Sequence, residues 1–184
     1  MQIAARRNLG FTLIELVITL AVIAILLATA MPAFGSLTQS TKAQTARSTL
    51  SATLGTARLA AVSRTSNVVV CPSRDQQYCG RTTEWQHGWL VFVDSDGDGA
   101  RDGGEELLEA SQAQPQGVAI LSSTGRVRIS YHPDGSSPGS NITLTVCDSR
   151  GADHASALII NNAGRVRSGT PSGAAATACV RSIH

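Results

Sequence analysis

An apolar run near the N-terminus constrains this chain more than any other feature. Residues 11–31 read FTLIELVITLAVIAILLATAM, and Glu15 is the only charged residue between Phe11 and Gln39. As a helix, these 21 residues would extend about 30 Å, close to the thickness of a bilayer's hydrocarbon core. The run is longer than the core of a cleaved secretory signal, and ATAMPAF matches a signal cleavage site poorly. The run therefore predicts a transmembrane segment over about 11–31.

Two basic residues before this run predict its orientation. Arg6 and Arg7 precede the apolar residues, and such charges stay on the cytoplasmic side of a membrane. We expect a single pass through the inner membrane, with the N-terminus in the cytoplasm and the rest of the chain in the periplasm.

The four cysteines fit an exported domain, because an even number in an oxidising compartment indicates disulfides. We favour the pair Cys71 and Cys79, since CPSRDQQYC is a short polar loop, and the pair Cys147 and Cys179, which would hold the tail. Free buried thiols are the alternative. Zinc fits less well, because the chain has no C-x-x-C pair and no clustered histidines.

Glu15 needs a cationic partner if the run lies in hydrocarbon, where a carboxylate costs about 3 kcal/mol. The run itself contains no lysine or arginine. If the chain were cut after Gly10, Phe11 would carry a free ammonium about one helical turn from Glu15. Between packed copies, Glu15 could neutralise the ammonium of a neighbouring subunit. The alternative is a plain membrane anchor with a stray glutamate.

The segment GFTLIELVITLAVIAIL resembles the N-terminus of type IV pilins and of type II secretion pseudopilins. Gly10 matches the residue before the cut, Phe11 the first mature residue and Glu15 the fifth. The resemblance implies cleavage of a leader, residues 1–10, by a prepilin peptidase, and N-methylation of Phe11. It also implies that Glu15 takes part in assembly with other pilin or pseudopilin subunits.

The remaining sequence predicts an α+β fold. Apolar residues recur at intervals of three and four from about 36 to 64, as in the amphipathic half of a long helix over 11–64. From 65 to 184, short β-rich runs alternate with turn signals, which predicts a head domain whose antiparallel sheet packs on that helix. The tail SGTPSGAAATAC has a flexible composition. The expected strands are 67–71, 88–94, 105–110, 117–123, 126–132, 141–148, 156–162 and 165–168.

The head sequence narrows the resemblance to the GspH/FimT group of minor pilins and minor pseudopilins. The stretches GWLVFVDSDGDGARDGGEELL, YHPDG and NNAGRVR are similar to segments of that group. The resemblance implies a type IV pilin-like fold. It leaves open a FimT-like pilus subunit for DNA uptake in natural transformation, a GspH-like subunit of a periplasmic pseudopilus for protein secretion, and an adhesin-like pilin.

The tetrapeptide GRVR occurs twice, within a basic half of the chain. Residues 33–110 carry 7 basic and 9 acidic residues, net −2, whereas residues 111–184 carry 6 and 3, net +3. In a strand, the two arginines of each copy would share one face, about 7 Å apart, with the valine on the other. Guanidinium groups bind phosphate, so the contact would be with a nucleic-acid backbone.

The FimT resemblance implies DNA binding by one copy of this motif. Gly164, Arg165 and Arg167 match the DNA-binding pattern of such pilins, and Arg126, Arg128 and Arg181 could add contacts. An ordinary solvated hairpin, with glycine for its turn and arginine for solubility, is the alternative.

The segment DSDGDGARDGGE matches the calcium loop of an EF-hand. Asp94, Asp96, Asp98 and Glu105 fall at ligand positions. Against calcium, Arg101 occupies a normally hydrophobic position, and the flanks resemble strands rather than helices. A polar hairpin turn is the alternative, and calcium is the only cofactor that the sequence suggests.

No enzymatic activity is expected from this chain. GSSPG spells the G-x-S-x-G pattern of a nucleophilic serine, but Pro138 follows the serine. Proline has no N–H to contribute to an oxyanion hole. The four histidines show no spacing typical of a catalytic triad or a metal site.

Overall fold

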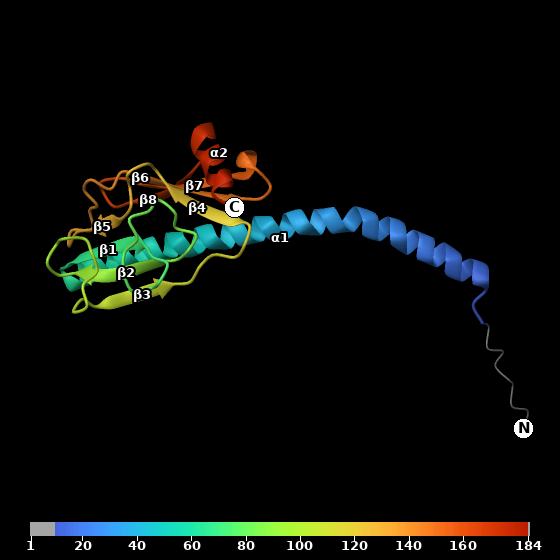
Figure 1. Cartoon of the computed structure of the whole chain (residues 1–184), viewed down its shortest axis with the longest axis horizontal. Coiled ribbons are helices and arrows are strands. Elements are labelled where there is room, and N and C mark those ends of the chain that lie inside the picture. The colour runs from blue at the N-terminus through green and yellow to red at the C-terminus, as the bar shows by residue number, and fades with distance from the viewer. Residues whose placement is uncertain (1–9, 184) are drawn as a thin grey trace, which may run out of the picture. The chain divides into compact units, whose positions relative to one another are not determined.

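The computed structural model describes residues 10–183. The chain divides into two units, Met1–Thr38 and Gln39–His184. Helix α1, Leu13–Arg64, contributes to both units, and the remaining elements belong to the second unit (Figure 1). Of the predicted leader, residues 1–10, only Gly10 lies within the described residues.

In the first unit, Thr12 caps the start of α1. The Oγ1 of Thr12 accepts a hydrogen bond from the Glu15 N–H at 3.3 Å, which satisfies one of the free donors at the helix start. Glu15 lies in the first turn, where the helix dipole favours a carboxylate. Within residues 10–183, no helix has both the length and the apolarity needed to cross a membrane.

The second unit contains two antiparallel four-stranded sheets, where the sequence predicted one. One sheet has the order β3-β2-β1-β5 and the other the order β4-β6-β7-β8. The predicted α+β class is confirmed, and seven of the eight strands lie close to their predicted ranges. The strands are β1 Asn67–Pro72, β2 Trp89–Asp94, β3 Leu107–Ser111, β4 Val118–Ser122, β5 Ile129–Tyr131, β6 Ile142–Asp148, β7 Ser156–Ile160 and β8 Val166–Gly169.

The core lies between the two sheets and the second half of α1. The buried residues of α1 recur at the predicted intervals of three and four, so that they form one face of the helix. This face belongs to one cluster with side chains of both sheets, including Val70 of β1 and Leu158 of β7. Each fully buried leucine contributes about 1.5–3 kcal/mol. The buried apolar helix residues are Ala46, Leu50, Leu54, Ala57 and Ala61, and Thr53 is also buried.

The segment before β2 joins the two sheets. Trp85 N–H donates to the Ile120 carbonyl at 2.9 Å, and Ser122 N–H donates to the Thr83 carbonyl at 2.9 Å. These bonds cover the outer edge of β4, which would otherwise leave unpaired backbone groups. The Trp85 side chain is fully buried in the same core cluster.

Both predicted disulfide pairings are confirmed: Cys71 bonds to Cys79, and Cys147 bonds to Cys179. The second bond joins β6 to helix α2, Gly173–Arg181. The predicted flexible tail is therefore wrong. The small residues are mostly alanines, which favour helix, and the Ser172 Oγ caps the helix by accepting from the Ala175 N–H at 3.3 Å.

Candidate functional site

The second GRVR copy forms the turn between β7 and β8 and the start of β8. Gly164 N–H donates to the Asn161 carbonyl at 2.8 Å, and Arg165 N–H donates to the Asn161 Oδ1 at 3.1 Å. Val166 packs on the core, whereas Arg165 and Arg167 are exposed. Because side chains alternate along a strand, the Arg167 guanidinium belongs to the face of the sheet opposite Val166. Arg165 precedes β8 and lines a hollow beside α1. The shared face of the two arginines therefore stays a prediction.

Gly164 is buried beneath this turn and positions it. Its φ is +72°, and a Cβ placed there would lie 2.1 Å from the Gly135 carbonyl oxygen. The Arg58 side chain holds the same region, donating from Nε to the Gly135 carbonyl at 2.8 Å and from Nη2 to the Ala163 carbonyl at 3.4 Å. Gly164 therefore supports the arginines that follow it and is not itself exposed to a ligand.

The first GRVR copy does not form a strand, so the prediction for this copy is wrong. The strand expected at 126–132 begins only at Ile129. Gly125 has a φ of +74° in a turn, and Arg126 N–H donates to the Ser123 carbonyl at 3.0 Å. Arg126 and Arg128 therefore lie outside a strand, and the alternation of side chains along a strand does not apply to them.

The two arginines of the first copy bind loop carbonyls. Arg126 Nη1 donates to the Gly139 carbonyl, and Arg128 Nη1 donates to the Gly99 carbonyl at 3.1 Å. Both side chains therefore connect loops of the head. Arg181, at the end of α2, is exposed, and the Cys147–Cys179 bond anchors its helix, so it does not lie in a flexible tail.

Three of the four predicted calcium ligands converge. Carboxylate oxygens of Asp94, Asp96 and Asp98 lie within 4.8 Å of one another. Asp94 is buried and the other two are exposed. Burial raises the pKa of Asp94, and the nearby carboxylates of Glu105 and Asp96 add to this rise, against hydrogen bonds from backbone N–H groups. A cation would relieve this repulsion.

The fourth predicted ligand, Glu105, has another use. Its carboxylate accepts hydrogen bonds from the Ser95 N–H at 2.8 Å and the Asp102 N–H at 3.0 Å, which close the base of the loop. It is not one of the three carboxylates that converge. The calcium site therefore stays a prediction that rests on Asp94, Asp96 and Asp98.

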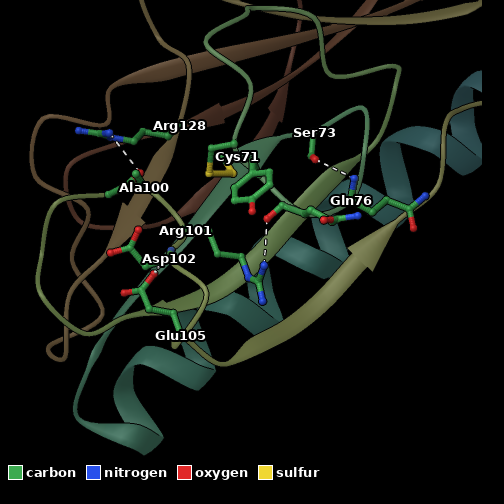
Figure 2. Close-up of a disulfide and its surroundings, with 12 residues drawn as sticks. Cys71, Ser73, Gln76, Ala100, Arg101, Asp102, Glu105 and Arg128 are labelled. Atoms are coloured by element: carbon green, nitrogen blue, oxygen red, sulfur yellow. Dashed lines mark hydrogen bonds between the residues drawn. A yellow bond between two sulfur atoms is a disulfide. The ribbon is translucent and has the colours of Figure 1, made fainter.

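Arg101, which does not fit the calcium pattern, connects two loops. Its Nη1 donates to the Gln77 carbonyl at 2.9 Å. Gln77 lies inside the loop closed by Cys71 and Cys79, so the acidic loop and the disulfide loop are held together (Figure 2). The acidic loop is thus fixed from both sides, by Arg101 and by Arg128.

Calcium is expected to raise the thermal unfolding midpoint of the chain. A ligand at one hundred times its dissociation constant stabilises the folded state by about 2.7 kcal/mol. The midpoint should be measured with calcium and with a chelator, in the wild type and in the Asp96→Asn/Asp98→Asn variant. The variant should lose the response. Equal midpoints of the wild type in both solutions would contradict the site.

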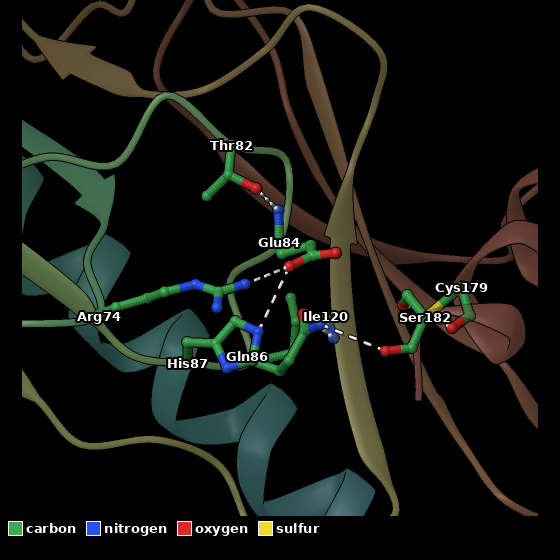
Figure 3. A network of polar contacts seen from close by, with 8 residues as sticks. All are labelled: Arg74, Thr82, Glu84, Gln86, His87, Ile120, Cys179 and Ser182. Atoms are coloured by element: carbon green, nitrogen blue, oxygen red, sulfur yellow. Dashed lines mark hydrogen bonds and ion pairs between the residues drawn. The ribbon is translucent and has the colours of Figure 1, made fainter. Parts of the chain in front are cut away.

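A polar cavity that the sequence did not indicate lies next to the C-terminal helix. It has a volume of about 650 Å³. At its wall, the Glu84 Oε2 lies 2.8 Å from the Arg74 Nη2 and 3.3 Å from the His87 Nε2 (Figure 3). Gln86 Nε2 donates to the Ser182 carbonyl at 3.5 Å. These groups hold the 82–87 loop and the C-terminal residues together, and the Glu84 carboxylate is already paired with Arg74 and His87.

The serine of the GSSPG stretch has a structural place. Ser137 is fully buried, and its Oγ donates to the Ser130 carbonyl at 2.7 Å. Its own N–H donates to the Asn162 carbonyl at 2.8 Å. Ser137 therefore connects β5 to the β7–β8 turn.

Two families have sequence models that match the chain. The family described as type II transport protein GspH matches residues 46–164, and the prokaryotic N-terminal methylation motif matches residues 5–31. No curated protein sequence matches the chain.

Solved structures of two kinds share the fold. The type IV minor pilin FimU of Pseudomonas aeruginosa is 20% identical, with a TM-score of 0.54 over 68% of this chain and 91% of FimU. The minor pseudopilin EpsH from the Type 2 Secretion System of Vibrio cholerae is 11% identical, with a TM-score of 0.50 over 71% of this chain and 98% of EpsH. These likenesses confirm the predicted type IV pilin-like fold.

Proposed function

This chain belongs to the GspH family of minor pilins and pseudopilins, and on that premise we propose that it is a minor type IV pilin whose Arg165 and Arg167 contact DNA during uptake. The exposed arginines of the β7–β8 hairpin carry this proposal. The hairpin is rigid, because Gly164 is packed against the Gly135 turn and Arg58 donates to both turns. Extended backbone over 165–167 would place the two guanidinium groups about 7 Å apart, a spacing that suits successive phosphates of one strand.

Membership of the family implies a structural role in a filament with other pilin subunits. The N-terminal methylation motif implies processing by a prepilin peptidase, and we place the cut after Gly10 and the methylation on Phe11. In the filament, Glu15 would neutralise the Phe11 ammonium of a neighbouring subunit. The disulfides support an oxidising compartment for the head, such as the periplasm. An inner-membrane precursor stays a prediction from Arg6 and Arg7, which lie outside the described residues.

Replacing both arginines is expected to weaken DNA binding and its salt dependence. Loss of two phosphate contacts should make the slope of log K against log salt shallower by about 1.8. Binding of a short duplex to the full chain and to its Arg165→Gln/Arg167→Gln variant should be measured at low and moderate salt. The fold should persist, because both side chains are exposed.

A matched control separates this patch from net charge. Arg74→Gln/Arg81→Gln removes the same charge from the acidic half of the chain, and the surface ion pair of Arg74 with Glu84 contributes little to stability. The control should bind DNA like the wild type. Equal weakening by both double variants would assign the binding to overall charge, and normal binding by Arg165→Gln/Arg167→Gln would exclude the site.

A minor pseudopilin of a type II secretion system is the second candidate. The family's own description as a type II transport protein and the fold shared with EpsH support it. In this case the head would contact other minor pseudopilins, and the β8 arginines would be solvated. Absence of DNA binding by the wild type at low salt would favour this candidate.

A further inference from the structure

One edge of the second sheet carries no neighbouring strand. In the order β4-β6-β7-β8, β8 pairs only with β7. Asn161 N–H, just beyond β7, donates to the Arg165 carbonyl at 3.3 Å, so by alternation Arg167 forms a hydrogen-bonded pair with Ile159 of β7. The N–H and C=O groups of Val166 and Ser168 therefore point away from β7. Within residues 10–183, no backbone or side-chain group bonds to them.

This free edge runs beside the outward face of α1. Two hollows of about 590 Å³ and about 380 Å³ lie between β8 and the helix, and both include Ser51. We name these two hollows together the α1–β8 groove. Positions 164–168 of its sheet wall would span about 16 Å, enough for an extended segment of about five residues. The groove is lined by Arg47, Ser48, Ser51, Ala52, Leu54, Gly55, Arg58, Leu59 and Val62 of α1, and by Leu158, Gly164, Arg165, Val166 and Ser168.

The helix wall of the groove combines open space with exposed apolar side chains. Leu59 is 66% exposed and Val62 is 47% exposed, although both lie on a helix whose other face is buried. Opposite the strand edge, a Cβ at Gly55 would meet nothing within 4 Å. A strand lying along β8 would therefore find room at Gly55 and apolar contacts at Leu59 and Val62.

The positive charge of the groove indicates which kind of peptide segment it would bind. Its charged lining residues are Arg47, Arg58 and Arg165, and no aspartate or glutamate lines it among the described residues. Arg58 is held in place by its bonds to the Gly135 and Ala163 carbonyls, so its positive charge stays at one end of the groove. An acidic segment is complementary to this charge.

We infer that the α1–β8 groove binds an extended acidic segment of another protein, which adds a strand to the free edge of β8. The main-chain groups of Val166 and Ser168 would supply the strand hydrogen bonds, and alternate side chains would meet Leu59, Val62 and the arginines. This inference goes beyond the proposed DNA contact. It shares Arg165 with that contact, but it uses the strand edge and the helix side of β8, whereas Arg167 belongs to the opposite face of the sheet.

The test uses a fluorescent synthetic peptide of eight alternating valine and glutamate residues, with the full chain as its receptor. Binding is followed by fluorescence anisotropy, and exchange of the Val166 and Ser168 amide hydrogens is measured with and without peptide. We expect binding of the valine–glutamate peptide, slower exchange at both amides, and at least about tenfold weaker binding of a valine–lysine peptide.

Two variants test the location of the site. Gly55→Leu fills the groove without meeting another atom in the fold, and it should weaken peptide binding at least about tenfold. Gly35→Leu is the matched control, since it adds the same side chain to α1 in equally open space but outside the groove. It should leave binding unchanged. Ser168→Pro removes one edge N–H, which an edge strand tolerates, and it should weaken binding with the fold retained.

Several outcomes would overturn the inference. These are absence of binding up to about 1 mM peptide, equal binding of the valine–lysine peptide, unchanged exchange at Val166 and Ser168, or wild-type affinity of Gly55→Leu. DNA binding of Gly55→Leu should equal that of the wild type, so a failure of the DNA proposal and a failure of the groove are distinguishable. If the duplex displaced the peptide from the wild type, and if Gly55→Leu also weakened DNA binding, the groove would be assigned to DNA.

Discussion

Replacing Gly164 with alanine is expected to lower the free energy of unfolding by about 2–5 kcal/mol. The φ of +72° at this position costs an L-residue about 1–2 kcal/mol. The new Cβ would also lie 2.1 Å from the Gly135 carbonyl oxygen, so that two backbone turns must separate. Overpacking of this kind costs about 1–3 kcal/mol more. Denaturant unfolding of the full chain measures the change.

The other GRVR copy supplies a matched control. Gly125 has a φ of +74°, almost the same as Gly164, but a Cβ there would meet nothing within 4 Å. Gly125→Ala should therefore lose only the conformational part, about 1–2 kcal/mol. Equal losses in both variants would show that the close approach to Gly135 contributes nothing. Because no ligand is present in these unfolding measurements, a larger loss for Gly164→Ala would report only the structural support that Gly164 gives the β7–β8 hairpin.

The Cys147→Ala/Cys179→Ala variant is expected to lose about 4 kcal/mol of stability. The two cysteines are 32 residues apart, and the entropy that a crosslink removes from the unfolded chain grows with the length of the loop. Helix α2 should also separate from the sheet, because Cys179 is one of its two buried residues. Denaturant unfolding gives the stability, and amide exchange over 173–181 reports the helix.

The shorter disulfide loop is the control for this prediction. Cys71 and Cys79 are 8 residues apart, so the same relation gives about 2.6 kcal/mol for Cys71→Ala/Cys79→Ala. The amides of α2 should keep their protection in this second variant. A larger loss from the shorter loop, or an unchanged α2 after loss of Cys179, would contradict the expected roles.

Local patterns predicted most of the elements. The helix, seven of the eight strands and the Cys71–Cys79 disulfide agree with the structure, because side-chain periodicity and a short cysteine loop depend on neighbours in the chain. The Cys147–Cys179 pairing, over 32 residues, also agrees. The N-terminal motif around Gly10, Phe11 and Glu15 identified the family for the same reason, as the relevant residues are adjacent. Two expectations were wrong: the strand expected at 126–132 begins only at Ile129, and the tail expected to be flexible contains helix α2. In both segments, the residue types are compatible with more than one conformation.

Contacts between distant residues decided the rest. The two GRVR copies are identical in sequence, yet Arg128 binds the Gly99 carbonyl whereas Arg167 stays exposed. No pattern within the tetrapeptide could separate them, because the difference comes from the loop that each copy meets. The same holds for Glu105, which hydrogen-bonds the backbone of its own loop instead of joining the acidic cluster.

Sequence alone therefore determined the family, the α+β class and the chemical character of each segment. Only the tertiary structure decided that the strands form two sheets, that Gly164 lies against Gly135, and that Val166 of β8 lines one hollow with Gly55 and Leu59 of α1. The physical reason is that propensity and periodicity act over a few residues. Packing, in contrast, brings together backbone groups about a hundred positions apart in the chain, and their contacts determine which exposed groups can bind a partner.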